Sequence, residues 1–183
     1  EFDGQPALIG RLIAGQPLFR FYQRRPALLH APREFVQTLL DVLAALEAMH
    51  AAGLLHRDVK PANILVRAGG YATLMDHDLS GPIREVFRVP LRIGTEAFQS
   101  PEDTACLPLE PSSDLWSVGV LLYWGLRGEL PSGEVMAGPS HLARLCALLL
   151  SPTPQQRPDA AQASAMLLEA ARHDFGPQAL PTT

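Results

Sequence analysis

Lysine is almost absent from this chain of 183 residues: Lys60 is the only one among its 15 lysine and arginine residues. Cysteine is scarce as well, and Cys106 and Cys146 lie far apart with no CxxC motif. This spacing indicates two reduced structural thiols rather than a disulfide framework. No block of like charges occurs, and the formal net charge is −4, so the composition gives no indication of binding to nucleic acid or to an anionic membrane.

Long hydrophobic runs are lacking too. The longest extends from Leu145 to Leu150, whereas a helix that spans a bilayer needs about 20 apolar residues. Together with the lack of a signal-peptide pattern, this predicts a cytoplasmic protein with no membrane segment within the chain. The length is that of about one domain, which is enough to bury a sizeable core.

Helical periodicity is clearest between Pro32 and Ala52, where Pro32 suits the first turn and Gly53 suits the end. The apolar residues recur at helical spacing: Phe35, Leu39, Leu43, Leu46 and Met49. The segment 114–126 is apolar nearly all round, which predicts a central, buried helix. Further helices are expected at 18–25, 142–150 and 160–172.

Strand patterns are short. Residues 64–66 and 71–75 flank an Ala-Gly-Gly turn and predict a hairpin, and residues 7–13 predict a strand before a turn at 15–17. The stretch 79–112 shows little periodicity, and loops of that length in compact domains are usually functional. The predicted fold class is mainly α with short β-hairpins.

The single lysine lies in the sequence His56-Arg57-Asp58-Val59-Lys60-Pro61-Ala62-Asn63, between the long helix and the hairpin. This spacing matches the H-R-D-x-x-x-x-N loop of protein kinases. Phosphoryl transfer needs a positioned base, a cation near the transferred group and a held Mg²⁺ ion. Asp58, Lys60 and Asn63 are residue types that meet these needs, and Asp76 follows Asn63 at the spacing of a second acidic group.

Further motifs follow in order: Gly94-Thr95-Glu96-Ala97-Phe98-Gln99-Ser100-Pro101-Glu102, then Asp114-Leu115-Trp116-Ser117-Val118-Gly119, then Arg157-Pro158. With the loop at 56–63 and the triplet Asp76-His77-Asp78, the chain resembles the C-terminal lobe of a eukaryotic-like Ser/Thr protein kinase. The resemblance covers residues 56–158 with five motifs. The triplet differs from the family's D-F-G at its second and third positions, and Phe98 replaces the usual Tyr.

The resemblance implies a role for each matched catalytic residue. Asp58 would accept the proton of the substrate hydroxyl, and Lys60 would reach the γ-phosphate of ATP. Thr95 would brace both residues and present the hydroxyl. Asn63 and Asp76 would bind Mg²⁺.

The resemblance also implies structural and nucleotide-binding roles. Asp114 would accept hydrogen bonds from backbone N–H groups of the catalytic loop, which begins with His56 and Arg57. Glu102 and Arg157 would form a buried ion pair. The stretch 11–18 is similar to the hinge between kinase lobes, so adenine would bond to backbone around Arg11 and Ile13 and pack on Leu65.

These matches divide the chain into three parts. Residues 1–16 would be the end of an N-lobe strand and the hinge, 17–173 the C-lobe of a kinase, and 174–183 a flexible tail. The C-lobe would contain the catalytic loop at 56–63 and the activation segment at 76–102.

Three features depart from the family. Kinases use a second lysine on an N-lobe strand to hold the ATP phosphates, and this sequence has no lysine besides Lys60. In the altered D-F-G triplet, His77 can pack where Phe packs, whereas Asp78 adds negative charge beside Asp76. The stretch from Gly128 to His141 is short, so the helix that docks substrates in the family is expected to be missing or a single turn.

Two functions from different classes fit these observations. The chain is either the C-lobe of a longer kinase that transfers phosphate from Mg-ATP to Ser or Thr of proteins, or a pseudokinase-like scaffold or regulatory module without catalysis. A glycine-rich loop and a V-A-I-K-like lysine encoded upstream of Glu1 would favour the enzyme. Small-molecule phosphotransferases with this fold are a third option, but they normally lack the segment 94–102.

The expected partner is a protein substrate or a partner protein. Without an N-lobe above it, the nucleotide cleft would leave Leu8, Ile9, Leu12 and Leu65 partly exposed. Such an apolar patch invites association, which predicts self-association or a partner lobe.

Overall fold

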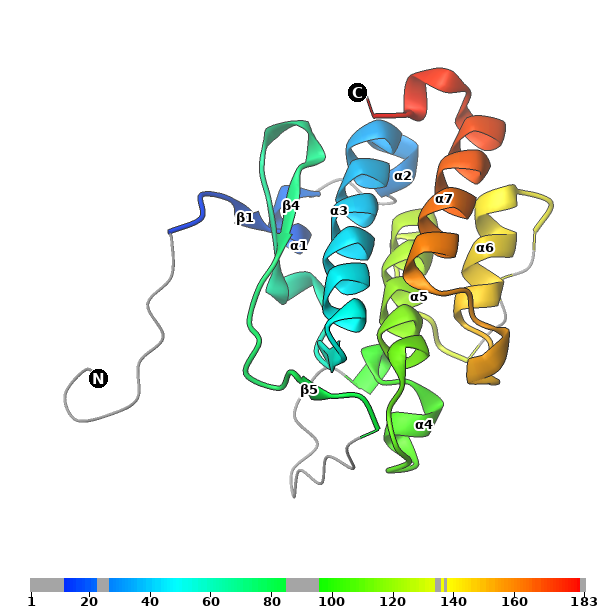
Figure 1. The fold of residues 1–183 in the computed structure, drawn as a ribbon. Coiled ribbons are helices and arrows are strands. Elements are labelled where there is room, and N and C mark those ends of the chain that lie inside the picture. The colour runs from blue at the N-terminus through cyan, green and yellow to red at the C-terminus, as the bar shows by residue number, and fades with distance from the viewer. Residues whose placement is uncertain (1–11, 23–26, 85–95, 134–135, 137, 182–183) are drawn as a thin grey trace.

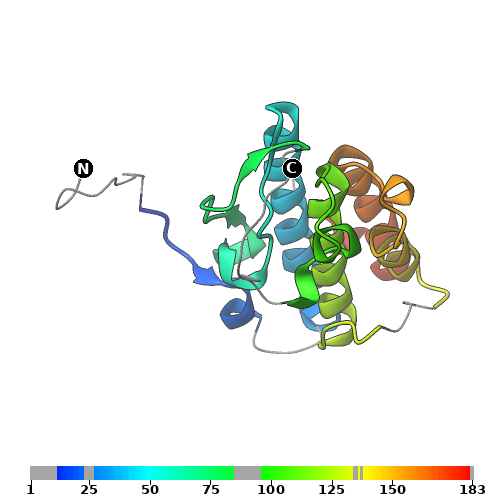
Figure 2. The same cartoon turned by 90° about the horizontal axis from the view of Figure 1, so that it is seen from below.

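The computed structural model describes residues 12–22, 27–84, 96–133, 136 and 138–181. Helix α3 (Pro32–Ala51) stands near the centre, with α5 (Pro111–Arg127), α6 (His141–Leu149) and α7 (Ala160–Phe175) on one side of it and a small sheet on the other (Figure 1). Figure 2 shows the same layers from below. The shorter helices of the described part are α1 (Leu18–Phe21), α2 (Ala27–His30) and α4 (Pro101–Thr104).

The predicted hairpin is present. Strands β3 (Ile64–Val66) and β4 (Ala72–Leu74) pair antiparallel, with Leu65 opposite Thr73. Strand β1 (Gln16–Pro17) adds to the other edge of β3. A second pair, β2 (Leu54–Leu55) with β5 (Gly81–Pro82), joins the end of α3 to the loop after β4.

The turn predicted at 15–17 is wrong, because β1 occupies that place. Gly15 explains the pairing: a Cβ there would lie 3.2 Å from the Leu65 Cβ, so the lack of a side chain lets the two backbones approach. Pro17 is tolerated because β1 is an edge strand. Of the strand predicted at 7–13, residues 7–11 lie outside the described residues, and Leu12 and Ile13 form no regular structure.

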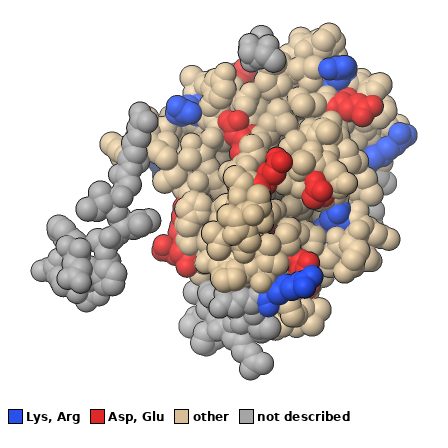
Figure 3. All heavy atoms as spheres, in the orientation of Figure 1, with Lys and Arg blue, Asp and Glu red and all other residues tan. Residues whose placement is uncertain are grey.

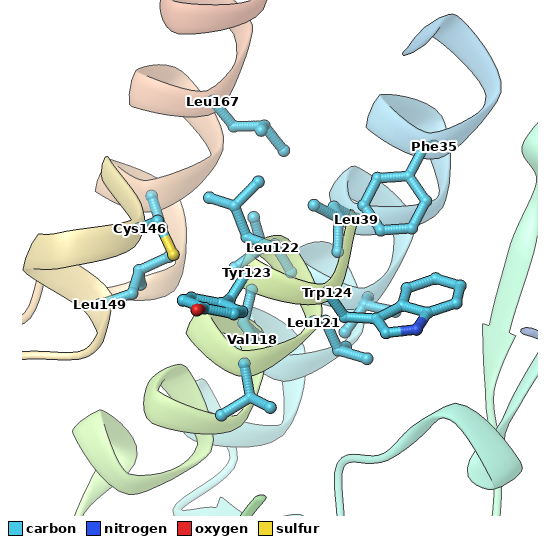
Figure 4. Packing of buried hydrophobic residues seen from close by; sticks show 14 of the residues in the cluster. Phe35, Leu39, Val118, Leu121, Leu122, Tyr123, Trp124, Cys146, Leu149 and Leu167 are labelled. Atoms are coloured by element: carbon cyan, nitrogen blue, oxygen red, sulfur yellow. The ribbon is translucent and has the colours of Figure 1, made fainter. Parts of the chain in front are cut away.

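The long helices begin and end close to their predicted bounds, and α3 provides one wall of the core. Phe35, Leu39, Leu43 and Leu46 are fully buried on one face of α3, while Met49 is only half-buried. Figure 4 shows Phe35 of α3 and Trp124 of α5 close together, with Cys146 and Leu149 of α6 packed across α5. Every residue of α5 from Val118 to Gly125 is buried, as predicted for a central helix.

Two segments differ from what the sequence led us to expect. The helix expected at 18–25 ends at Phe21, and residues 23–26 lie outside the described part. The tail predicted to begin at residue 174 starts within α7, which continues to Phe175, and a 3₁₀ turn (Pro177–Ala179) follows. Asp174 accepts hydrogen bonds from the backbone of His141 (3.0 Å) and Leu142 (2.9 Å) at the start of α6, and Ala179 is fully buried.

The surface shows no large field of one charge sign on the face in Figure 3, where acidic and basic side chains lie in small separate groups. Among the residues that the structure describes, no helix combines the length and apolar character that crossing a bilayer requires. Between Gly128 and Ser140, the described residues form no helix, which agrees with the shortness of this stretch.

A buried hydroxyl pair joins α1, α3 and the hairpin turn. The Thr38 hydroxyl donates to the carbonyl of Gly70 (2.7 Å) and lies 2.8 Å from the Tyr22 hydroxyl. Because a threonine hydroxyl carries one hydrogen, Tyr22 must be the donor to Thr38. Burial raises the pKa of Tyr22, so the donor stays protonated. At Gly70 the backbone has φ 80°, and a Cβ would collide with backbone atoms of Glu34, so only glycine fits this turn.

Gly125 of α5 makes room for the Phe35 ring of α3. A Cβ at this position would collide with ring atoms of Phe35. The Phe35 ring is held in turn by Tyr22 at 5.2 Å and by Trp124 at 5.9 Å between ring centroids. Glycine within a helix costs about 1 kcal/mol relative to alanine, and the space that Phe35 occupies offsets that cost.

We expect Gly125→Ala to lower the free energy of unfolding by about 1–3 kcal/mol, because the added methyl group overpacks the core. Urea unfolding followed by circular dichroism measures the change. Gly138→Ala is the control, since its Cβ would meet only the Ala143 Cβ at an ordinary 3.6 Å. A Gly125→Ala protein as stable as the parent would show that the two helices are not packed this closely.

Candidate active site

Asp114, in the first turn of α5, holds the start of the loop 56–63. Its Oδ2 accepts a hydrogen bond from the backbone N–H of His56 (3.0 Å), and its Oδ1 accepts one from the N–H of Arg57 (2.8 Å). The sequence led us to expect such bonds, and the structure adds a third donor, because His50 Nε2 at the end of α3 lies 2.9 Å from Oδ2. Asp114 is 2 % exposed, so charge-assisted hydrogen bonds replace those that water would make with its carboxylate.

The loop backbone turns sharply beside this anchor. Arg57 has φ 66°, in the left-handed region that non-glycine residues seldom adopt. Its guanidinium crosses to the β2–β5 pair, where Nη2 donates to the carbonyl of Pro82 (2.7 Å). A Cβ on Gly81 would come within 2.7 Å of Arg57 Nη1, so the glycine makes room for this crossing. Asp76 has φ 65°, and strained residues of this kind cluster at functional sites.

The neutral imidazole of His56 links Asp58 to Met75, the residue before Asp76. Its Nε2 lies 3.1 Å from the carbonyl oxygen of Met75, which can only accept, so Nε2 carries the hydrogen. Its Nδ1 accepts from the N–H of Asp58 at 3.3 Å. Burial lowers the pKa of His56, despite the nearby Asp114 carboxylate, which keeps this tautomer neutral. The ring of His77 packs edge-on against His56, with centroids 5.1 Å apart.

Asp58, Lys60 and Asn63 converge on a single oxygen. Lys60 Nζ lies 2.7 Å from Asp58 Oδ2, and Asn63 Nδ2 donates to the same oxygen at 2.8 Å and to the Asp58 carbonyl at 2.9 Å. Oδ1 of Asp58 receives no hydrogen bond from any described residue. One oxygen of the carboxylate is thus fixed, and the other is free to accept a proton from a hydroxyl group.

Asn63 and Asp76 offer oxygen atoms next to this cluster. The amide nitrogen of Asn63 bonds to Asp58, which leaves the Asn63 Oδ1 available. The N–H of Met75 donates to the backbone carbonyl of Asn63 (2.8 Å), so Asp76 directly follows a residue that is bonded to Asn63. No set of three or more His, Cys, Asp or Glu residues forms a metal cluster in the described part. Mg²⁺ fits this donor set, because it binds through one or two carboxylates together with water and substrate phosphates.

The nucleotide-binding residues predicted from the hinge are only partly described. Leu65 and Ile13 are half-buried, and Leu12 is 95 % exposed. Arg11 and Thr95 lie outside the described residues. Leu65 is therefore placed on β3, the strand that directly follows the 3₁₀ turn ending at Asn63. The other hinge contacts and the role of Thr95 stay predictions.

Glu102 and Arg157 form a buried two-point ion pair. Arg157 Nη1 and Nη2 lie 2.6 and 2.9 Å from the two carboxylate oxygens. Ser113 donates to Glu102 Oε1 (2.8 Å), and Arg157 Nε donates to the carbonyl of Ser151 (2.9 Å). Burial alone would raise the pKa of Glu102, but the hydrogen bonds from Arg157 and Ser113 hold it below its ordinary value. The pair fixes the end of the segment 76–102 to the loop before α7.

Sequence reasoning missed three contacts that shape the site. They are the bond from His50 to Asp114, the packing of His77 on His56, and the Ser117 hydroxyl, which donates to the carbonyl of Phe98 (2.8 Å). Only His50 carried a signal, as a polar residue at the end of an apolar helical stripe. The other two depend on contacts between distant segments.

The ion pair predicts a pH dependence of stability. Because the pKa of folded Glu102 lies below the ordinary value of 4.5, its stabilising contribution is complete above that pH and is lost as the pH falls through the folded pKa. We expect Glu102→Gln to lower the free energy of unfolding by about 3–5 kcal/mol at neutral pH, since Arg157 is left buried without its partner. Stability should then fall less steeply below about pH 4.5 in the variant than in the parent.

Denaturant unfolding at a series of pH values measures both effects. Glu169→Gln is the matched control, because that side chain is 76 % exposed, and its effect should stay within about 0.5 kcal/mol. Parallel pH profiles for the parent and Glu102→Gln would contradict the assignment.

Known proteins are similar to this chain over most of its length. Residues 5–167 match the family described as Protein kinase domain. The chain is 39 % identical over 132 residues to the serine/threonine-protein kinase PknL of Mycobacterium tuberculosis. The matched region covers 70 % of this chain and 33 % of that protein. It is 32 % identical over 162 residues to PknA of the same organism, covering 86 % of this chain and 36 % of that protein.

A mouse protein, sperm motility kinase 3A, is 30 % identical over 174 residues, which covers 85 % of this chain and 34 % of that relative. The chain thus spans about a third of the length of the curated relatives it matches. With a family match over most of its length, this chain belongs to the protein kinase family and is a member of its eukaryotic-like Ser/Thr branch.

Proposed function

We propose that this chain is the C-terminal lobe of a longer kinase that transfers phosphate from Mg-ATP to Ser or Thr of protein substrates. One observation carries the proposal: Lys60 and Asn63 both bond to Asp58 Oδ2, while Oδ1 accepts no bond from the described residues. A carboxylate held by one oxygen, with the other free, is arranged to accept a hydroxyl proton.

The other residues of the site have complementary roles in this proposal. Lys60 places a positive charge near the transferred phosphoryl group, where negative charge develops. Asn63 and Asp76 hold Mg²⁺ when it is bound, and the metal neutralises the phosphates. His56 keeps Asp58 and the segment before Asp76 in one fixed relation through its bonds to the Asp58 N–H and the Met75 carbonyl.

A second lysine for the ATP phosphates must come from outside this chain, because the sequence contains only Lys60. The curated relatives are about three times as long as the part that this chain matches, which leaves room for that element. Leu12, 95 % exposed beside β1, then lies where an N-lobe, a partner lobe or a second copy would cover it.

A scaffold without catalysis is the second candidate, and the triplet Asp76-His77-Asp78 favours it. His77 is occupied by its contact with His56, and Asp78 adds an exposed carboxylate beside Asp76. An additional negative charge there either recruits cation or repels phosphate. Nucleotide binding distinguishes the two outcomes directly.

We expect Mg-ATP to raise the melting temperature of this chain. A free ligand at ten times its Kd stabilises the folded state by about 1.4 kcal/mol, or roughly 3–6 °C for a chain of this size. Asp76→Asn should abolish the rise, since it removes a metal-binding carboxylate, and ATP with a chelator should give none. Differential scanning fluorimetry measures all of these shifts.

Glu169→Gln is the matched control, because it removes one negative charge from a side chain on α7 that is 76 % exposed, and it should keep the shift. A shift that survives Asp76→Asn would contradict the metal role of Asp76. No shift at millimolar Mg-ATP would contradict a nucleotide half-site in this chain and favour the scaffold.

A further inference from the structure

A pocket of about 270 Å³ opens beside the catalytic loop. Its walls are mainly apolar and are contributed by Phe19, Phe98, Trp124, Leu130 and Ala62, with Lys60 at one side. Ligand pockets for small molecules usually measure about 300–1,000 Å³. The volume therefore suits a single side chain better than a nucleotide or a cofactor.

The pocket combines a rigid floor with exposed apolar walls. Trp124 and Phe98 are 3 % and 8 % exposed and form part of the core, whereas Phe19 and Leu130 are 43 % and 38 % exposed. Aromatic side chains in a well-packed depression are typical anchors for a partner's side chain. The exposed Phe19 and Leu130 gain most from being covered, because their apolar surface faces water in this structure.

The pocket is fixed relative to the active site by two connections. Lys60 lines the pocket and also lies 2.7 Å from Asp58 Oδ2. Trp124 is on α5, the helix whose first turn carries Asp114, and Ser117 of the same helix bonds to the carbonyl of Phe98. Because Lys60 belongs to both the pocket and the active site, an extended peptide of about five residues, roughly 17 Å long, is enough to reach from Asp58 into the pocket.

The charges around the pocket favour an apolar occupant. Among the described residues that line the pocket, Glu129 is the one carboxylate and Lys60 is the one cation. Lys60 repels a basic side chain, and a single exposed carboxylate attracts one only weakly. An acidic side chain would meet Glu129, so a large apolar side chain is the group that best matches the mainly apolar lining.

We propose that this pocket binds a large apolar side chain, such as Leu, Met or Phe, of the substrate peptide within about five residues of the phosphoacceptor. The inference rests on the proposed function and deepens it, since it names the class of substrate sequence. A peptide whose hydroxyl lies at Asp58 passes Lys60 and continues into the pocket. The pocket then contributes to substrate selection, and its residues take no part in the transfer step.

Binding of labelled peptides tests the proposal without requiring catalysis. Each peptide carries a central Ser in an alanine background, with Leu, Phe, Lys or Glu placed at one flanking position at a time. Fluorescence anisotropy with the full chain measures their affinities. We expect Leu or Phe at one position to bind roughly ten times or more tighter than Ala, Lys or Glu there.

Leu130→Asp should remove this preference, because it places a carboxylate on the apolar wall. Leu148→Asp is the matched control: Leu148 is 40 % exposed on α6, lies outside the pocket lining, and should leave the preference intact. Circular dichroism confirms that both variants fold. Equal affinities for the Leu and Ala peptides, or no binding by any peptide, would overturn the proposal.

Phosphotransfer to the same peptides by the intact protein separates this inference from the proposed function. Peptides that bind with the apolar preference but are never phosphorylated would contradict the proposed function alone. Phosphorylation that depends on Asp58 but is indifferent to apolar residues would contradict the pocket alone. Asp58→Asn should lose phosphorylation and keep the binding preference.

Discussion

The buried carboxylate of Asp114 is the contact on which the candidate site depends. It accepts the N–H groups of His56 and Arg57 and the ring of His50, and hydrogen bonds to a charged group contribute about 1.5–3 kcal/mol each. These bonds offset the strain of Arg57 in the left-handed region. Because α5 is buried along most of its length, Asp114 is held rigidly, and its hydrogen bonds hold the loop that carries Asp58 and Lys60 in place.

From this anchor the geometry extends through His56. A neutral imidazole that accepts from Asp58 and donates to Met75 links the candidate base to the segment with the candidate metal ligand. These two bonds tie the loop 56–63 to the segment that begins at Asp76. The ion pair of Glu102 and Arg157 holds the far end of the segment 76–102 in the same way, so both ends of that segment are tied to the helical core.

Features that depend on residues close together in the sequence could be predicted, whereas features that depend on contacts between distant segments could not. The bounds of α3, α5, α6 and α7 follow from apolar periodicity, and the convergence of Asp58, Lys60 and Asn63 follows from their closeness in one loop. Two-residue strands such as β1 and β5 have no periodicity to detect and form because a partner strand is near. The contact of Asp174, at the end of α7, depends on the start of α6, and the Ser117 bond depends on Phe98; in each case the partner is distant in sequence.

Amide hydrogen exchange in Asp114→Asn tests the central claim most directly, because Asn keeps the shape of Asp but loses the charge and one acceptor oxygen. The account predicts that protection of the His56 and Arg57 amides falls by about tenfold or more, equivalent to about 1.4 kcal/mol or more of local stability. Amides within β3, β4 and the middle of α5 should change much less. Unchanged protection at His56 and Arg57 would contradict the claim that Asp114 holds the catalytic loop in place.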